Sequence, residues 1–283
     1  MLRAGIDEFA RRLVKRSLRR LGRPFACESY LANYLLARHL ASLFRARNVK
    51  CVLDVGANFG QYASFLRDMV GYRGLIVSFE PVSECVVRLR DLAARDSDWV
   101  ICDYALGAED TAQEINVMKS LFFSSFLKPD DSLVKDFQTK NAVDRTESVR
   151  IRRLDSVIDG LRREHDLDNI YLKIDTQGYD MEVLKGAEAA MKSVVALQTE
   201  MTFLPLYHQA TPFREAFEIV GAHGFELSGL FPVSYDSQMR LVEADCVFVK
   251  RGGPAEGLEE TSRPAVAKTA ERTVPVDECG SVK

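Results

Sequence analysis

The chain has 283 residues, enough for one large domain or two small ones, and its composition is 47% hydrophobic, 28% charged and 9% aromatic. These values exclude wholesale disorder, a collagen-like fibre and a disulfide-dense mini-protein, and no run approaches the roughly 18 apolar residues of a membrane-spanning helix. Residues 51–250 hold 21 Lys and Arg against 32 Asp and Glu, an acidic balance that argues against nucleic acid as the main partner.

Residues 1–48 are predicted to form a basic, helical N-terminal arm. Within 6–21, apolar residues recur at helical spacing and the opposite face carries Arg and Lys, and a second helical stretch follows at about 28–46. The first 50 residues hold 12 Lys and Arg against 3 Asp and Glu. The amphipathic stretch 6–21 has three interpretations: its apolar face packs on the body or on a second copy in a homo-oligomer, the stretch lies on an anionic membrane, or it binds nucleic acid. The acidic body disfavours the last.

After residue 50, short apolar runs alternate with amphipathic stretches. The predicted strands are 51–55, 75–79, 99–103, 170–174, 195–201, 225–230 and 245–250. The predicted helices lie at about 60–70, 83–95, 155–165, 180–192 and 212–223. Strands that alternate with helices predict an α/β fold, in which helices cover both faces of a mainly parallel sheet.

Residues 111–153 interrupt this alternation. They contain two possible extra strands, 114–118 and 148–152, and a polar loop around Ser124 and Ser125. Insertions of this kind often cover an active site. We therefore expect the two serines to line a pocket.

The six cysteines are scattered and form no CxxC pair, which predicts reduced thiols, mostly buried, in a cytoplasmic protein. The first residues also lack the apolar segment of a secretory signal. Residues 252–283 contain three prolines, four glycines and few large apolar groups, and they are predicted to be a disordered tail.

One stretch carries the strongest chemical signal: VLDVGANFGQ at 52–61 runs from a strand into a glycine-rich turn and then a helix. Glycines at such a turn permit positive φ and the close approach of a ligand. The dinucleotide pattern G-x-G-x-x-G fails at Asn58 and Gln61, and no G-K-[ST] of a P-loop follows. An acid, Glu80, ends the next strand 20 residues after Gly60, where such an acid faces the ribose of a nucleoside.

This block resembles the first motif of S-adenosylmethionine-dependent methyltransferases, with Glu80 matching their ribose-binding acid. Further blocks narrow the resemblance: FEP at 79–81, YALG at 104–107, LKIDTQGYD at 172–180 and VLKGA at 183–187. Together they are similar to the FkbM family of O-methyltransferases over roughly residues 50–250. Many members have D-x-E-G where this chain has Gln177, a departure that removes one carboxylate and weakens the argument for a metal there.

The resemblance implies a set of cofactor-binding residues at the carboxyl ends of the strands. Asp54 would order the turn beside the methionine amino group, and Glu80 would bind the ribose. The backbone of the turn would pass close to methionine and ribose, and Asp103 or the backbone beside Ala105 would meet adenine. The full set is Asp54, Gly56, Ala57, Asn58, Gly60, Glu80, Asp103 and Ala105.

Three residues are candidates for catalysis. Asp175 ends the fourth core strand, where a carboxylate would accept the proton of a hydroxyl nucleophile. Alternatively, Asp175 would hold a divalent cation with Glu200 as a second ligand, or would cap the next helix, although Asp180 suits capping better. His208 follows the fifth strand, where it would either reach the acceptor pocket or lie in a surface loop.

The sequence therefore predicts a Rossmann-like class I methyltransferase fold at 49–251, with a mainly parallel seven-stranded sheet and added N-terminal helices. The resemblance implies methylation of a hydroxyl, with a sugar of a glycolipid or polysaccharide, or a natural product, as acceptor. The enzyme would be cytoplasmic, with peripheral contact to the inner membrane face through 6–21. The alternative is a non-catalytic, membrane-associated binding protein that keeps the fold; a nicotinamide oxidoreductase has little support beyond the fold type.

Overall fold

The computed structural model describes residues 24–130 and 142–252, with side chains from residue 31 onward, and all of these residues belong to one compact unit. The amphipathic stretch 6–21 and residues 253–283 of the expected tail lie outside the described residues. The helical elements are α2 (Pro24–Ala46), α3 (Gln61–Phe65), η1 (Leu66–Val70), α4 (Ser83–Ala93), η2 (Leu121–Phe123), α5 (Leu154–Glu164), α6 (Asp180–Lys185), η4 (Ala190–Lys192) and α7 (Phe213–Ala222). The strands are β1 (Cys51–Val55), β2 (Leu75–Phe79), β3 (Trp99–Cys102), β4 (Ala105–Leu106), β5 (Thr111–Met118), β6 (Val143–Arg152), β7 (Ile170–Ile174), β8 (Val194–Thr202), β9 (Phe225–Tyr235) and β10 (Leu241–Lys250).

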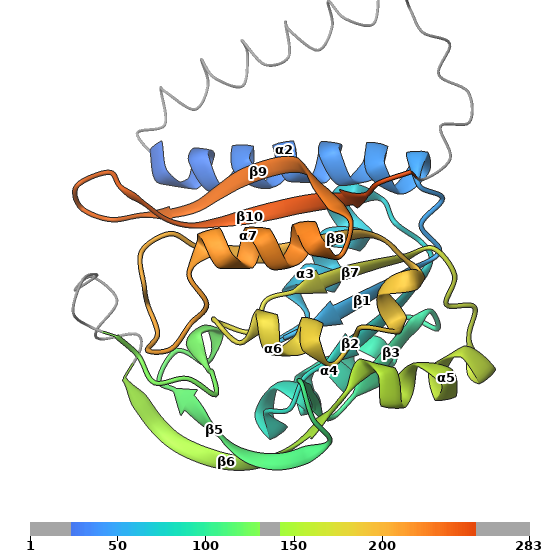
Figure 1. Cartoon of the computed structure of the whole chain (residues 1–283), viewed down its shortest axis with the longest axis horizontal. Helices are drawn as coiled ribbons and strands as arrows, with labels where there is room; N and C mark the ends of the chain where they lie inside the picture. Colours follow the sequence, from blue (N-terminus) through green and yellow to red (C-terminus); the bar gives the residue numbers. More distant parts are fainter. Residues whose placement is uncertain (1–23, 131–141, 253–283) are drawn as a thin grey trace, which may run out of the picture. The chain divides into compact units, whose positions relative to one another are not determined.

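The main sheet has seven strands in the order β3-β2-β1-β7-β8-β10-β9 (Figure 1). Strands β3, β2, β1, β7 and β8 run parallel, whereas β10 runs antiparallel to both β8 and β9. Every residue of β1 and β7 is buried, as expected for central parallel strands that are covered on both faces. The predicted α/β class with a mainly parallel seven-stranded sheet is confirmed.

Helices cover both faces of the sheet, and successive residues of one strand contact different helices. Val52 packs with α2, α3 and η1, through a cluster that includes Leu40 and Leu66. The next residue, Leu53, belongs to the cluster on the opposite face, which includes residues of α5, α6 and α7. Helix α2 is therefore part of the core of this unit, although the sequence assigned it to an N-terminal arm.

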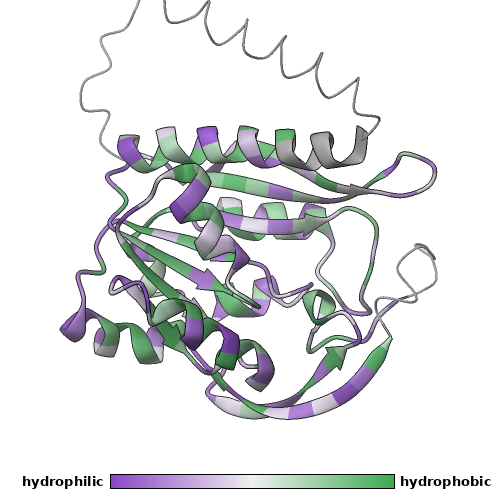
Figure 2. Ribbon diagram, turned by 180° about the vertical axis from the view of Figure 1, so that it is seen from behind, coloured by the Kyte–Doolittle hydropathy of each residue, from purple (hydrophilic) through white to green (hydrophobic). Residues whose placement is uncertain are grey.

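The insertion pairs with β4, which precedes it, to form a second, three-stranded sheet in the order β4-β6-β5. Strands β5 and β6 pair antiparallel and are longer than the two extra strands expected at 114–118 and 148–152. In Figure 2 this ribbon carries many hydrophilic residues, whereas strands of the main sheet are largely hydrophobic. Its inner residues, including Ile115 and Val117, pack with Val82 at the start of α4, so the insertion covers the carboxyl ends of the central strands.

The helix expected at 180–192 ends at Lys185 because the next residues contact segments that are distant in the sequence. A Cβ at Gly186 would lie 1.9 Å from the carbonyl oxygen of Gly107, so the chain here packs directly on another backbone segment. The Asp155 carboxylate then accepts the N–H groups of Ala189 and Ala190, which starts the short helix η4. The helix expected at 60–70 is likewise divided, into α3 and a π-helical turn, η1.

Four cysteines within the described part of the chain are free and buried, as predicted: Cys51, Cys85, Cys102 and Cys246. Among the helices that the structure describes, none combines the length and the apolar character needed to cross a bilayer.

Candidate active site

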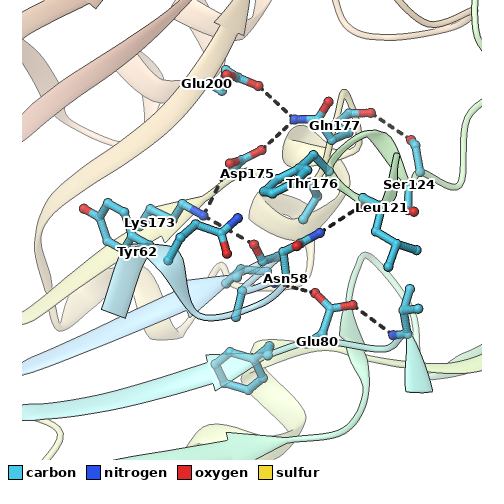
Figure 3. A pocket seen from close by; sticks show the side chains of 18 of the residues that line it. Asn58, Tyr62, Glu80, Leu121, Ser124, Lys173, Asp175, Thr176, Gln177 and Glu200 are labelled. Carbon is cyan, nitrogen blue, oxygen red and sulfur yellow. Dashed lines mark hydrogen bonds and ion pairs between the residues drawn. The ribbon is translucent and has the colours of Figure 1, made fainter. Parts of the chain in front are cut away.

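A cavity of about 350 Å³ lies at the carboxyl ends of the central strands, the usual place for a ligand in an open α/β sheet (Figure 3). The turn after β1, the end of β2, the end of β7 and the insertion all line it. Helix α2 adds Asn33 and Leu36, and β9 adds Val233. The sequence argument did not anticipate these three residues, because nothing in the local pattern of α2 or β9 indicates which distant loops they approach.

The glycine-rich turn has the backbone that the sequence predicted, with φ of 77° at Gly56 and 82° at Gly60. Both glycines are also required by the protein's own packing. A Cβ at Gly56 would lie 1.9 Å from the Asp175 carbonyl oxygen, and one at Gly60 would lie 2.8 Å from the Trp99 ring. Asn58, also left-handed, donates from its side chain to the Leu121 carbonyl at 3.0 Å and so joins the turn to the insertion.

Glu80 is 5% exposed and lines the cavity at the end of β2. One carboxylate oxygen accepts the N–H of Asn58 at 2.8 Å, and the other accepts the N–H of Val82 at 2.9 Å. Burial raises the pKa of Glu80 to about 7, and the two N–H groups oppose that rise. The acid therefore lies beside the glycine turn in the wall of the cavity.

Lys173 is a buried cation between two carboxylates at the bottom of the cavity. Its Nζ lies 3.2 Å from Asp54 and 3.5 Å from Asp175. Burial alone would lower the pKa of Lys173, but the two carboxylates outweigh burial and hold that pKa above its ordinary value. Asp54 also accepts a hydrogen bond from Ser78 Oγ at 3.3 Å, and Ser78 accepts one from Trp99 Nε1 at 2.9 Å. The sequence argument missed Lys173, although a lysine inside the apolar run IYLKI was a usable signal.

Gln177 occupies the centre of the acidic end of the cavity. Its Nε2 donates to Asp175 Oδ1 at 2.8 Å and to Glu200 Oε2 at 3.0 Å (Figure 3). Its Oε1 accepts the Tyr207 hydroxyl at 3.0 Å. Burial and nearby carboxylates, Glu243 first among them, raise the pKa of Glu200 well above its ordinary value. The structure thus brings Asp175 and Glu200 together, with a glutamine amide between them.

The wall beside β8 and β10 is also acidic. Gln198 Oε1 accepts the hydroxyls of Tyr62 and Tyr171, each at 2.7 Å, and its Nε2 donates to Asp245 at 2.8 Å. Burial raises the pKa of Asp245 to about 6. Carboxylates thus outnumber Lys173 around this end of the cavity, which makes it suited to a positively charged ligand.

The remaining predicted residues divide between the cavity and the surface. Ala57, Ala105, Ser124 and Ser125 line the cavity. Asp103 is not in the cavity wall: its side chain is 43% exposed and pairs with Arg90 at 2.9 Å and Arg150 at 2.8 Å.

His208 also lies outside the cavity wall, and its side chain is 61% exposed beside Asp130. The preceding residue, Tyr207, is the one that reaches the site through Gln177. Within residues 24–130 and 142–252, no three His, Cys, Asp or Glu side chains are placed to hold a metal ion together.

The chain is similar in structure to several proteins of known activity. Magnesium protoporphyrin IX methyltransferase from Synechocystis, solved with bound S-adenosylmethionine, is 9% identical with a TM-score of 0.41, over 81% of this chain and 85% of that one. Fibrillarin from Aeropyrum pernix, also with bound S-adenosylmethionine, is 10% identical with a TM-score of 0.39, over 71% and 66%. An rRNA methylase from Streptococcus thermophilus is 8% identical with a TM-score of 0.40, over 76% and 94%. No curated relative matches the sequence.

The family comparison is more specific. Residues 54–227, more than half of the chain, match the methyltransferase FkbM domain. This range starts at the acid of the glycine-rich turn and includes every residue of the cavity from β1 to β8. The chain belongs to the FkbM family, and it is an S-adenosylmethionine-dependent methyltransferase with the class I fold.

Proposed function

We propose that the protein is an O-methyltransferase that acts on a hydroxyl of a sugar-containing acceptor. One observation carries the proposal: a single cavity is lined by Glu80 and the glycine turn and also by Asp175, which lies between Lys173 and Gln177. Glu80 and the turn suit a nucleoside, and Asp175 provides a carboxylate where a hydroxyl would lose its proton.

The residues of the cavity fit S-adenosylmethionine. The Glu80 carboxylate would accept hydrogen bonds from the ribose hydroxyls, and Leu106, Ile115 and Phe126 form an apolar wall that suits adenine. The acidic end suits the positive charge of the sulfonium and of the amino group. When bound, S-adenosylmethionine supplies an electrophilic methyl group.

Asp175 is the residue best placed to take the proton. Its side chain is 35% exposed and lines the cavity, and Lys173 and Gln177 hold its two oxygens. A hydroxyl becomes acidic as it forms a bond to carbon, so a carboxylate within reach accepts the proton at that moment. Glu200 also lines the cavity, but burial and nearby carboxylates raise its pKa well above its ordinary value, which disfavours its charged, proton-accepting form.

The opening of the cavity supports an acceptor that is part polar and part apolar. Phe122 and Val233 line the cavity and remain 53% and 50% exposed. Asn33 and Ser124 lie in the same wall and offer hydrogen bonds. A sugar carried on a lipid or on a natural product combines both kinds of surface.

A thermal shift with S-adenosylhomocysteine tests the cofactor site. At about 100 times its dissociation constant, the ligand should stabilise the protein by about 2.7 kcal/mol, a rise of several degrees in the unfolding midpoint. Glu80→Ala should abolish this rise, whereas Glu114→Ala, an exposed change on β5, should keep it. An equal rise in the unfolding midpoint of both variants would show that Glu80 does not bind the cofactor.

The acceptor is tested with S-adenosylmethionine carrying a labelled methyl group, incubated with purified glycolipid and polysaccharide fractions. We expect label in a methylated monosaccharide that survives mild alkali, since an ether is stable where a methyl ester is not. Asp175→Asn should reduce the transfer by about a hundredfold or more while S-adenosylhomocysteine still binds. Label on an amine or a carboxylate would contradict the proposal.

A further inference from the structure

Gln177 links two acidic side chains that come from different strands. Asp175 follows β7 and Glu200 lies in β8, and the two N–H bonds of one amide nitrogen reach one oxygen of each (Figure 3). The residue holds this position with φ of 52°, a conformation that a glutamine rarely adopts. The strain indicates that the side chain's contacts, rather than local backbone preference, keep it there.

The orientation of the amide follows from its neighbours. With the opposite assignment, Oε1 would face both Asp175 and Glu200, and the amide would donate no hydrogen to either acid. In the orientation shown, Oε1 instead accepts the Tyr207 hydroxyl. Acidic groups that meet inside a protein need a proton, a cation or N–H donors between them, and here the donor is a neutral amide.

Gln177 also joins this acidic pair to the insertion. Its backbone carbonyl accepts the Ser125 hydroxyl at 2.8 Å. The Tyr207 hydroxyl, which contacts Oε1, also lies 2.9 Å from the Phe123 carbonyl. Both contacts reach the insertion, which also lines the cavity. Gln177 therefore contacts the acidic pair directly and the insertion both directly and through Tyr207.

We propose that Gln177 is a positioning residue that bridges Asp175 and Glu200 in the place of a divalent cation. In this role it directs Asp175 into the cavity and fixes the insertion around it. The contacts of Gln177 with the two acids do not depend on the reaction. The proposal rests on the proposed function only in assuming that Asp175 accepts the proton of the acceptor hydroxyl.

The test compares variants that change charge or remove the amide. Gln177→Glu removes the N–H donors and adds a third carboxylate, so its unfolding midpoint in EDTA should fall by roughly 5 °C or more. Millimolar Mn²⁺ should restore that loss, and electron paramagnetic resonance should detect one bound Mn²⁺. Gln177→Met removes the amide without adding charge, so it should be destabilised and should not respond to Mn²⁺.

The controls separate this role from a general effect of charge. Wild type and Gln113→Glu, which adds a carboxylate at an exposed position of β5, should not respond to Mn²⁺. An exchange variant, Gln177→Glu with Glu200→Gln, keeps the net charge and returns one amide to the cluster. It should recover most of the stability without metal, and it decides the question if Gln177→Glu alone does not fold.

Two results would overturn the proposal. One is a Gln177→Glu protein as stable in EDTA as Gln113→Glu, and the other is an exchange variant no more stable than Gln177→Met. Binding of S-adenosylhomocysteine is measured in parallel. If the wild type does not bind S-adenosylhomocysteine, the proposed function is rejected, but the result with Mn²⁺ still tests the role of Gln177.

Discussion

Two glycines with nearly the same backbone conformation meet very different surroundings in this protein. Gly56 and Gly71 both have φ of 77°. At Gly56 an added Cβ would lie 1.9 Å from the Asp175 carbonyl oxygen, whereas at Gly71 nothing lies within 4 Å. The pair therefore separates the cost of a left-handed backbone from the cost of a steric clash.

Gly71→Ala should lower the free energy of unfolding by about 1–2 kcal/mol, the usual cost of a left-handed alanine. Gly56→Ala carries the same cost and must also displace the start of the loop after β7, so we expect a loss of roughly 3 kcal/mol or more. Urea unfolding followed by circular dichroism measures both variants. Equal losses would show that the loop after β7 yields easily.

At the scale of the element, α2 is the helix for which the structure differs most from the prediction. Leu40 is completely buried and packs against the face of the sheet that Val52 and Tyr171 form. Leu35, five positions earlier on the same helix, is 51% exposed. Asn33 and Leu36 line the cavity, so the packing of α2 also shapes the site.

Leu40→Ala should cost about 3 kcal/mol of unfolding free energy, because it leaves a cavity between α2 and the sheet. Leu35→Ala, the matched change on the exposed side of the helix, should cost less than about 0.5 kcal/mol. Denaturant unfolding at equilibrium measures both. If the two variants were equally stable, α2 would contribute little to this core.

The sequence predicted an element well where neighbouring residues alone determine it, and poorly where contacts with distant residues do. Strands β1, β2 and β7 were predicted within a residue because each is a short, mainly apolar run flanked by polar residues or glycine. The end of α6 was missed because Asp155, far away in the chain, caps η4. The resemblance assigned Asp103, or the backbone beside Ala105, to adenine, but the Asp103 side chain pairs at the surface with Arg150, 47 positions later.

The site shows the same limit. Glu80 and the glycine turn follow from spacing alone, since strand ends in a parallel sheet meet at one edge. Gln177 was noted only as a missing carboxylate, because its contacts with Glu200 and Tyr207 join separate segments. A sequence pattern shows which residues lie at the edge of the cavity. It does not show as readily which of their side chains contact one another.

For the whole molecule, buried acids dominate the response to pH. Burial raises the pKa of four carboxyl groups to about 6 or 7: Glu80, Asp180, Glu243 and Asp245. In the unfolded chain these groups lose their protons near pH 4 to 4.5. Between about pH 4.5 and 7 the folded protein therefore binds more protons than the unfolded chain, so stability falls as pH rises.

We expect the unfolding free energy of the free protein to decrease between pH 5 and pH 7.5 and then to level. Glu243→Gln should flatten the curve by roughly 2–3 kcal/mol over this range, since about 1.4 kcal/mol accompanies each unit of pKa difference. Glu114→Gln, on the exposed side of β5, should leave the slope unchanged. Denaturant unfolding of the three proteins at four pH values tests this expectation. An unfolding free energy of the wild type that rises over this range would contradict it.

The position of Trp99 gives the protein an optical reporter of its own. It is the single tryptophan of the chain, its ring lies against Gly60, and its Nε1 is joined through Ser78 to Asp54. Its fluorescence therefore senses the glycine turn and the buried charges beneath it. Titrations of cofactor, product and acceptor are accessible on the unmodified protein, and stopped-flow mixing gives the order in which the substrates bind.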